Sequence, residues 1–414
     1  MFWLSLSSKE LFHSNFLAWI GTLPGDRGKN HPFRRLMCDL GAKNENWGDD
    51  WFVAREYMNF DLCVLSSAPD ESQDSEDGNG GSGAKRNKER SPKILLVLEN
   101  KLKSIPYIEQ LDKYCNKVKD RHNVDFLLLS MADEFPDKEA VKEQGIWKIV
   151  SYKTYLKSLS DIPFEGYEKQ IVTDYCSQLG CIQTLCERWT GDLLESQFLY
   201  FQNGNGGRIL QEEYLQLKQL RIHDLYHKYR HAHICSELKN QLSSALQAAG
   251  YDNYGFIQVA DYKKTRLKRI NINLGFGFLH GEPVLDLYLI VDKLNLYVIQ
   301  VQADHYVHGW VRLDSKYKGH PEDLWKLVSE KDDWWLQSPQ SPILKDRNNR
   351  TKPFGKYDSA NSMFVYKYWL IDATAKVKDL LACMVQDFIC LCERVYPLEP
   401  KRQAIFPESP NELM

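Results

Sequence analysis

The chain has 414 residues, 43% of them hydrophobic, which is enough for a large buried core and predicts two domains. Its net charge of -3 excludes a general attraction to nucleic acid, so any such binding must come from a local basic patch or from metal ions. Ten cysteines without a CxxC pair indicate reduced thiols in a cytoplasmic protein, and the lack of an apolar run of about 18 residues argues against a membrane span.

The first 65 residues predict two helices and two strands. In "ELFHSNFLAWI" (10–20) the apolar residues recur at helical spacing, which predicts an opening helix with His13 on its surface. A second helical piece covers about Phe33 to Leu40. The segment "DDWFVAREYMNFDLCVL" then predicts two strands that meet near Asn59, and the second of them contains Asp61.

Residues 66–92 contain no large apolar residue and change from an acidic block to a basic one through a glycine tract, which predicts a flexible insertion. The insertion joins the strand of Asp61 to the strand of Glu99. These strands can still pair as a hairpin, because the entropy of loop closure rises only slowly with loop length.

The strand "ILLVLENKLKS" (94–104) begins as a run that is typical of burial on both faces, but it ends in charged residues. We expect Ser104 to cap the next helix, with Pro106 in its first turn and an apolar stripe at residues 108, 111, 115 and 118. Strands at 124–130 and 145–152 follow, and then a helix from about Thr154. This order predicts a mixed α/β layer fold.

The second half of the chain has a different character. A possible boundary at "GNGGR" (204–208) precedes a helical, histidine-rich segment over about 209–249. Strict alternation over 270–278 and two further apolar runs predict an antiparallel meander. We therefore predict a first domain over residues 1–200 and a C-terminal α+β domain over residues 201–414.

The charged end of the 94–104 strand suggests metal-assisted chemistry. Side chains alternate along a strand, so Glu99 and Lys101 emerge on one side, and Asp61 can lie beside Glu99 if the two strands pair. Two carboxylates and a backbone carbonyl are hard oxygen ligands of the kind that Mg²⁺ prefers. Lys101 could orient a metal-activated water or neutralise charge on a phosphate, which suits phosphodiester hydrolysis.

The segments "NFDLCVL", "VLENK" and "QLDKY" resemble the PD-(D/E)XK nuclease superfamily, and "ELFHSNFLAWI" is similar to the start of an uncharacterised bacterial branch of it. The resemblance covers about residues 8–160 and implies a restriction-endonuclease-like mixed sheet core flanked by helices. It implies metal ligands at Asp61, Glu99 and Glu10, a catalytic lysine at Lys101, and a QxxxY element at Gln110 and Tyr114 that contacts the active site or DNA. Phe60 replaces the proline of the motif, and residues 66–92 exceed the usual hairpin.

The resemblance implies a cytoplasmic, metal-dependent hydrolase that cleaves DNA, for example an endonuclease, with Mg²⁺ as cofactor and Mn²⁺ as a substitute. Bacterial defence or DNA processing is the implied role. The alternative is an inactive nuclease-fold module that binds nucleic acid or a protein, and a third possibility is hydrolysis of RNA or a nucleotide. Each site residue also has a structural alternative: Glu99 and Lys101 as a solvated pair, Glu10 in a capping box with Ser7, Asp61 at a strand start or turn, and Gln110 and Tyr114 on an ordinary helix flank.

Outside this site, the run "KKTRLKR" is the best candidate for phosphate contact, although such a run is more often only solvated. Its basic residues are Lys263, Lys264, Arg266, Lys268 and Arg269. The histidines at positions 223, 227 and 231 are spaced for zinc, but neighbouring cations predict a solvated basic face instead. We expect the C-terminal domain to position the DNA, to recruit a protein partner or to form a homo-oligomer.

Overall fold

The computed structural model describes residues 10–43, 47–69, 92–198, 212–257, 268–279, 282–291, 295–312, 335, 339, 341–345 and 363–398. The chain divides into two compact units, Met1–Ser196 with Phe201–Glu237, and Gln197–Tyr200 with Leu238–Met414. The boundary predicted at residue 200 falls within 199–211, outside the described residues, and it stays a prediction. No helix among the described residues is both long and apolar enough to cross a membrane.

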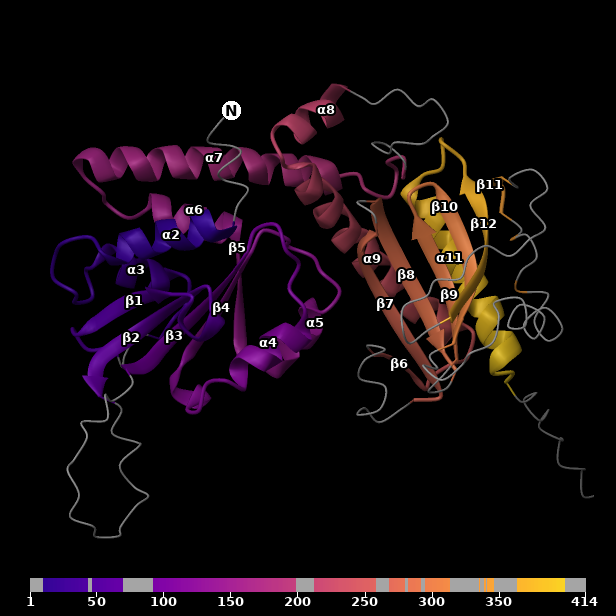
Figure 1. The fold of residues 1–414 in the computed structure, drawn as a ribbon, viewed down its shortest axis with the longest axis horizontal. Helices are drawn as coiled ribbons and strands as arrows, with labels where there is room; N and C mark the ends of the chain where they lie inside the picture. Colours follow the sequence, from indigo (N-terminus) through magenta and orange to yellow (C-terminus); the bar gives the residue numbers. More distant parts are fainter. Residues whose placement is uncertain are drawn as a thin grey trace, which may run out of the picture. The chain divides into compact units, whose positions relative to one another are not determined.

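The first unit contains a five-stranded mixed sheet in the order β1-β2-β3-β4-β5 (Figure 1). Its strands are β1 (Trp51–Arg55), β2 (Leu62–Pro69), β3 (Pro92–Lys101), β4 (Asp125–Ser130) and β5 (Trp147–Ser151). The pairs β1–β2 and β2–β3 are antiparallel, whereas β3–β4 and β4–β5 are parallel. The predicted pairing of the Asp61 and Glu99 strands is therefore confirmed. Residues 70–91 of the predicted insertion lie outside the described residues.

Helices cover both faces of this sheet, which confirms the predicted fold class for this part of the chain. Figure 1 shows α2 (Glu10–Gly21), α6 (Tyr152–Ser160) and α7 (Gly166–Thr190) on one face, and α4 (Ile108–Cys115) and α5 (Lys138–Gln144) on the other. Helix α3 (Pro32–Asp39) packs against α2 and α6. Short 3-10 turns occupy Tyr57–Asn59 and Arg121–Asn123. Helices α5 and α7 are absent from the sequence prediction.

Helix α4 begins later than the sequence predicts. Its N-cap residue is Tyr107, whose side chain makes no capping hydrogen bond. The backbone N–H of Ile108 instead donates to Asp137 Oδ2 at 3.2 Å, and Asp137 belongs to the loop after β4. The prediction of Ser104 as the cap is wrong, because a side chain 29 residues away satisfies this N–H group.

Helices α8 (Glu212–Gln219) and α9 (His223–Ala248) form the predicted histidine-rich helical segment, with a break at Arg221, where φ is +57°. Residues 223–237 of α9 group with the first unit. His227, Arg230 and His231 are each at most 5% exposed. The prediction of a solvated basic face is therefore wrong. A sequence cannot reveal that apolar neighbours and hydrogen-bond partners from elsewhere in the chain cover these polar side chains.

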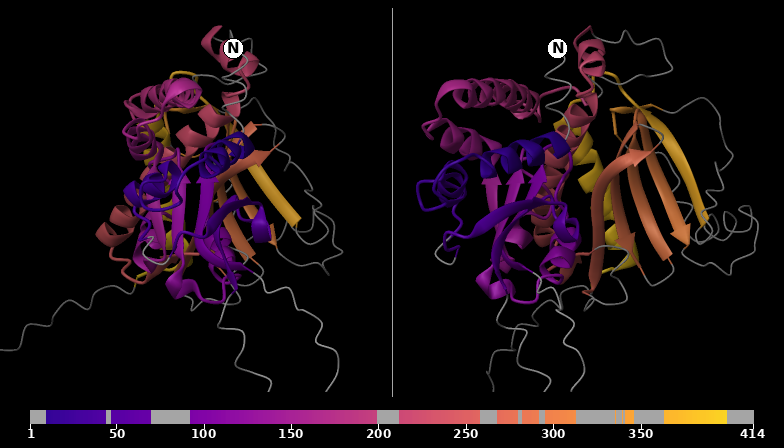
Figure 2. Two further views of the ribbon diagram at one scale, coloured as in Figure 1. Left: turned by 90° about the vertical axis from the view of Figure 1, so that its left-hand side faces the viewer. Right: turned by 60° about the vertical axis from the view of Figure 1, so that its left-hand side comes forward.

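The second unit is an α+β arrangement around a seven-stranded sheet in the order β11-β12-β10-β9-β8-β7-β6. Its strands are β6 (Tyr254–Phe256), β7 (Ile270–Leu279), β8 (Glu282–Ile290), β9 (Asn295–Gln302), β10 (His305–Arg312), β11 (Leu344–Lys345) and β12 (Met363–Ile371). Successive strands from β7 to β10 pair antiparallel, which confirms the predicted meander. Figure 2 shows α11 (Val377–Val395) along one face of this sheet, where Asp387 accepts hydrogen bonds from Tyr306 and His308 of β10.

Candidate active site

Strand pairing brings Asp61 beside the charged end of β3. Leu62 lies opposite Leu98 in the antiparallel register, so the preceding residue, Asp61, lies next to Glu99. Asp61 Oδ2 accepts a hydrogen bond from the backbone N–H of Asn100 at 2.8 Å. This bond fixes the carboxylate of Asp61 at the edge where β2 begins and β3 ends.

Glu99 and Lys101 form an ion pair on the same side of β3, with Lys101 Nζ 2.7 Å from Glu99 Oε1. The Glu99 side chain is 2% exposed and the Lys101 side chain is 8% exposed. Screening by water is weak at such buried positions, so the charges of the two groups interact strongly. The alternation predicted from sequence therefore places the carboxylate and the ammonium group together.

Helix α4 adds Gln110 and Tyr114 to the same group. Gln110 Nε2 donates to Glu99 Oε1 at 3.4 Å and to Tyr114 Oη at 2.9 Å. Burial raises the pKa of Tyr114, the Gln110 hydrogen bond lowers it, and the charges of Glu99, Lys101 and Asp61 act on it as well. The structure thus brings all five predicted catalytic residues into one neighbourhood, although their roles stay predictions.

Cys63 lies on the same face and was missed by the sequence analysis. Burial, together with the charge of Glu99, raises the pKa of the Cys63 thiol to about 12. The thiol is therefore neutral at physiological pH, and it supplies packing volume rather than a nucleophile. Its position two residues after Asp61 on the same strand is the sequence signal that could have placed it here.

On the opposite side of β3, buried side chains from the covering helices support the strand. Asn100 Oδ1 accepts a hydrogen bond from the Tyr152 hydroxyl at the start of α6. His13 of α2 lies edge-on to Tyr152 and bonds the Tyr175 hydroxyl through Nδ1 at 2.9 Å. His13 is 0% exposed, so its predicted place on the helix surface is wrong. It belongs to the support on the far face, away from Glu99 and Lys101.

Other predicted site residues lie outside this group or outside the described part of the chain. Glu10 is the first residue of α2, and its side chain is not described. Lys263, Lys264 and Arg266 lie outside the described residues. Lys268 and Arg269 are exposed just before β7 in the second unit, where Arg269 Nη2 donates to the Pro397 carbonyl at 3.0 Å. The predicted phosphate contacts of these residues stay predictions.

Asp61 and Glu99 carry oxygen donors of the kind that a hydrated divalent ion needs. Among the described residues, no cluster of three or more histidine, cysteine, aspartate or glutamate side chains is arranged to hold a metal. Asp61 and Glu99 offer two carboxylates at adjoining strand ends. Mg²⁺ is commonly bound by one or two carboxylates while it keeps several waters, whereas structural zinc needs four protein ligands.

Residues 86–177 match the sequence model of the PD-(D/E)XK nuclease superfamily. The predicted resemblance is confirmed over these residues. The matched region contains Glu99, Lys101, Gln110 and Tyr114, and Asp61 lies before it. Nucleases of the PD-(D/E)XK superfamily generally use divalent metal ions. No curated protein and no solved structure matches the chain.

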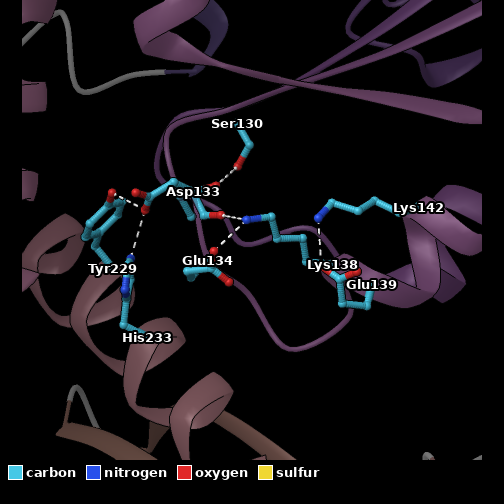
Figure 3. Close-up of polar contacts among 9 residues, drawn as sticks. Ser130, Asp133, Glu134, Lys138, Glu139, Lys142, Tyr229 and His233 are labelled. Carbon is cyan, nitrogen blue, oxygen red and sulfur yellow. Dashed lines mark hydrogen bonds and ion pairs between the residues drawn. The ribbon is translucent and has the colours of Figure 1, made fainter. Parts of the chain in front are cut away.

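The loop after β4, which lies within the matched residues, is also attached to α9. In Figure 3, dashed lines join Asp133, in the loop after Ser130 of β4, to Tyr229 and to His233. The Tyr229 hydroxyl donates to Asp133 Oδ1 at 2.6 Å, and His233 Nε2 lies 2.9 Å from the same oxygen. Partial burial would raise the pKa of Asp133, but the two hydrogen bonds, the charge of His233 and a backbone hydrogen bond together hold the pKa below its usual range. Nothing in the sequence links residue 133 to this helix.

Lys103, two residues past Lys101, contacts the first turn of the same helix. Its Nζ lies 3.0 Å from Asp224 Oδ1 and 3.1 Å from Oδ2, and 3.0 Å from the carbonyl oxygen of Arg221. The loops that follow β3 and β4 are therefore both held by α9. Since the loop after β3 leads directly from the strand end that bears Glu99 and Lys101, α9 helps to fix the rim of the candidate site.

Proposed function

We propose that the first unit is a metal-dependent nuclease that hydrolyses DNA phosphodiester bonds. The observation that carries the proposal is the convergence of Asp61, Glu99 and Lys101 where β2 begins and β3 ends, with Lys101 Nζ 2.7 Å from Glu99 Oε1. The match to a nuclease superfamily over residues 86–177 supports a nucleic acid as substrate. DNA as the preferred nucleic acid, and a role in bacterial defence or DNA processing, are parts of the proposal.

The proposed roles follow from the chemistry of each side chain. Asp61 and Glu99 would hold the metal, and Mg²⁺ fits their oxygen donors. The bound ion would supply positive charge to the phosphate and lower the pKa of an attacking water. Lys101 would donate hydrogen bonds to that water or to the phosphate oxygens as charge develops on them. In the reaction the water oxygen would bond to phosphorus and lose a proton, while the bond from phosphorus to one sugar oxygen would break and that oxygen would take up a proton from solvent.

Gln110 and Tyr114 would orient the carboxylate of Glu99. The amide of Gln110 joins Glu99 Oε1 to the Tyr114 hydroxyl, so the three groups hold one another in a fixed arrangement. Groups that share hydrogen bonds in this way lose less freedom when a substrate or ion arrives, and this preorganisation favours catalysis. Both side chains are half-buried, so they could also contact nucleic acid.

Burial of the central ion pair favours one rival, an inactive module that keeps the fold and binds nucleic acid or a protein. Glu99 and Lys101 are nearly inaccessible and neutralise each other, an arrangement that can be purely structural. The proximity of Asp61 favours the nuclease instead. A second carboxylate beside Glu99 adds repulsion that a bound cation relieves.

The experiment is a cleavage assay on plasmid, linear duplex, single-stranded DNA and RNA, with Mg²⁺, with Mn²⁺ and with EDTA. We expect metal-dependent cleavage of DNA that falls by about a hundredfold or more in Asp61→Asn and Lys101→Ala. Glu165→Gln, at an exposed helix start, is the matched control and should cleave like wild type. Equal behaviour of wild type and both site variants on every substrate would leave the inactive module as the better account.

A further inference from the structure

The turn that delivers Asp61 to the site has a strained backbone. Glu56, Met58 and Asn59 have φ values of +54°, +56° and +66°, and none of them is glycine. Asparagine tolerates this left-handed conformation, but for glutamate and methionine the Cβ atom crowds the following carbonyl oxygen. Such a turn persists only where the surrounding structure holds it. Since the turn ends next to Asp61, whatever holds it also places that carboxylate.

Lys117, just after α4, makes the contacts that hold this turn. Its Nζ donates to the carbonyl oxygen of Met58 at 2.9 Å. The same ammonium group lies over two aromatic rings, 5.5 Å from the centre of Phe60 and 5.0 Å from the centre of Tyr114. Each contact is favourable for a cation, and together they join the middle of the turn to α4.

The two rings complete the connection to the site. Phe60, 1% exposed, packs edge-on against Tyr114 with ring centres 5.4 Å apart. Phe60 directly precedes Asp61, and Tyr114 is bonded to Gln110, which reaches Glu99. Lys117 therefore contacts two residues that support the site. One is Phe60, which precedes Asp61, and the other is Tyr114, which reaches Glu99 through Gln110.

We propose that Lys117 is a positioning residue that clamps the strained turn and so fixes Asp61 beside Glu99. The importance of this clamp for catalysis rests on the proposed nuclease function, but the placement of Asp61 does not. A direct phosphate contact by Lys117 is the competing role. The geometry favours the clamp, because the ammonium group is directed to a backbone carbonyl and lies over two rings of its own fold.

The backbone N–H of Asn100 reports on this placement without metal or substrate, because it donates to Asp61 Oδ2. The test compares amide hydrogen exchange in the full-length, metal-free protein and in Lys117→Met, which keeps a long side chain but lacks the charge. We expect Asn100, Asn59 and Phe60 to exchange about tenfold faster in the variant, because the hydrogen bonds from their N–H groups to Asp61 Oδ2 and to the carbonyls of Glu56 and Tyr57 open more often. Lys117→Arg, which keeps a cation and stacks on rings, should restore most of the protection.

Two references make the result specific. Lys119→Met removes a nearby exposed lysine and should leave these exchange rates unchanged. The amides of β4 should keep their wild-type rates in Lys117→Met. Unchanged exchange at Asn100 would overturn the proposal, and so would an equal acceleration at β4, because that result means a general loss of stability.

A second measurement separates this proposal from the nuclease function. In calorimetric titrations with Mn²⁺, we expect affinity to fall about fivefold in Lys117→Met and to stay at the wild-type value in Lys119→Met. If wild type binds no Mn²⁺, the metal role of Asp61 fails, while exchange at Asn100 still decides whether Lys117 is the clamp. Normal exchange with weakened binding of duplex DNA would identify Lys117 as a phosphate contact and overturn the clamp.

Discussion

At the scale of single residues, the ion pair of Glu99 and Lys101 is a feature of the first unit that is costly to bury. Both charged groups are removed from water, and that removal costs free energy which their mutual attraction must offset. Removing one partner leaves the other charge buried without compensation. Replacing both removes the problem, so the two single variants and the double variant should differ strongly in stability.

We therefore predict that Glu99→Gln lowers the free energy of unfolding by about 3–5 kcal/mol, and that the double variant Glu99→Gln with Lys101→Met recovers part of this loss. Denaturant unfolding in EDTA measures both effects without any contribution from bound metal. Glu139→Gln, which removes one partner of an exposed pair with Lys142, serves as the control and should unfold like wild type. A small loss of unfolding free energy in Glu99→Gln would mean that Lys101 does not depend on Glu99 for its burial.

The buried histidines of α9 predict a dependence of stability on pH. Burial, followed by the charges of His231, His223, Arg230 and Lys218, lowers the pKa of His227 to about 3. Burial also lowers the pKa of His231 to about 4, against a bond from its Nδ1 to the His227 carbonyl, which acts in the opposite direction. In the unfolded chain both residues titrate near 6.5.

The unfolded state therefore binds more protons than the folded state below pH 6.5. No stability is lost to this effect above that pH, and the loss grows as the pH falls toward the folded pKa values. Between pH 6.5 and 5, we expect each histidine to cost up to about 2 kcal/mol. Scanning calorimetry at pH 7.5 and 5 should show a smaller drop in melting temperature for His227→Leu than for wild type. An identical drop in the two proteins would mean that protonation of His227 does not cause the loss of stability at pH 5.

These residues also show what a sequence can and cannot reveal about a site. Glu99 and Lys101 were predictable because alternation along one strand fixes their common side, and Asp61 followed from the adjoining strand. Lys117 carries no such signal, since its role depends on a turn 59 residues earlier in the chain. Cys63 and Asn100 likewise gain their roles from the face of the sheet on which pairing puts them.

At the scale of elements, apolar periodicity predicted the stripe of α4 but not the start of the helix. Leu111 and Cys115 are buried as the spacing required, and the Trp147 indole N–H of β5 donates to Cys115 Sγ at 3.0 Å. The cap came from Asp137, a residue that only the tertiary fold brings near. Helix α5 was missed because it is seven residues long and has a single buried side chain, Val141.

The first half of α9 is the element whose role differs most from expectation. Its polar side chains make directed contacts with loops of the sheet: Tyr229 and His233 with Asp133, and Asp224 with Lys103. The charge and histidine content of this segment are typical of a solvated helix, because a sequence does not show which residues its side chains contact in the fold. The helix is better described as a brace over the ends of β3 and β4.

We predict that Tyr229→Phe loosens this brace. The lost hydrogen bond reaches a carboxylate, but Asp133 is 58% exposed and water competes for it, so we expect a loss of only about 1 kcal/mol. Amide exchange should rise over residues 223–237 and over the loop at 131–137. Tyr167→Phe, at a tyrosine that is 79% exposed, is the matched control. Wild-type exchange rates in Tyr229→Phe would mean that this hydrogen bond does not hold α9 against the loop.

At the scale of the whole molecule, the two sheets were predictable in type because their strands carry different patterns. The continuous apolar run in β3 indicated a strand buried on both faces, whereas alternation in β7 indicated an antiparallel meander. Long helices such as α7 and α11 were not predicted. The buried residues of both helices nevertheless recur at helical spacing, for example Val172, Tyr175 and Leu179 in α7, so a local signal was present in the sequence and was missed.

The grouping of residues 201–237 with the first unit leads to a prediction about where the nuclease-like region can be cut. A chain that ends at residue 200 lacks Asp224, Tyr229 and His233, and it leaves Trp189 of α7 without Tyr226, whose ring packs edge-on against it at 5.2 Å. A chain that ends at residue 237 keeps all of these contacts.

We expect the chain ending at residue 237 to unfold in one cooperative transition, and the chain ending at residue 200 to melt at least about 10 °C lower or to aggregate. Circular dichroism melting of the two purified proteins at equal concentration is the measurement. Equal melting temperatures would mean that α9 adds little to the first unit, and the rim of the candidate site would then have to be held by β3, β4 and α4 alone. A higher melting temperature for the longer chain would make residues 201–237 part of the smallest folded unit that presents Asp61, Glu99 and Lys101 together.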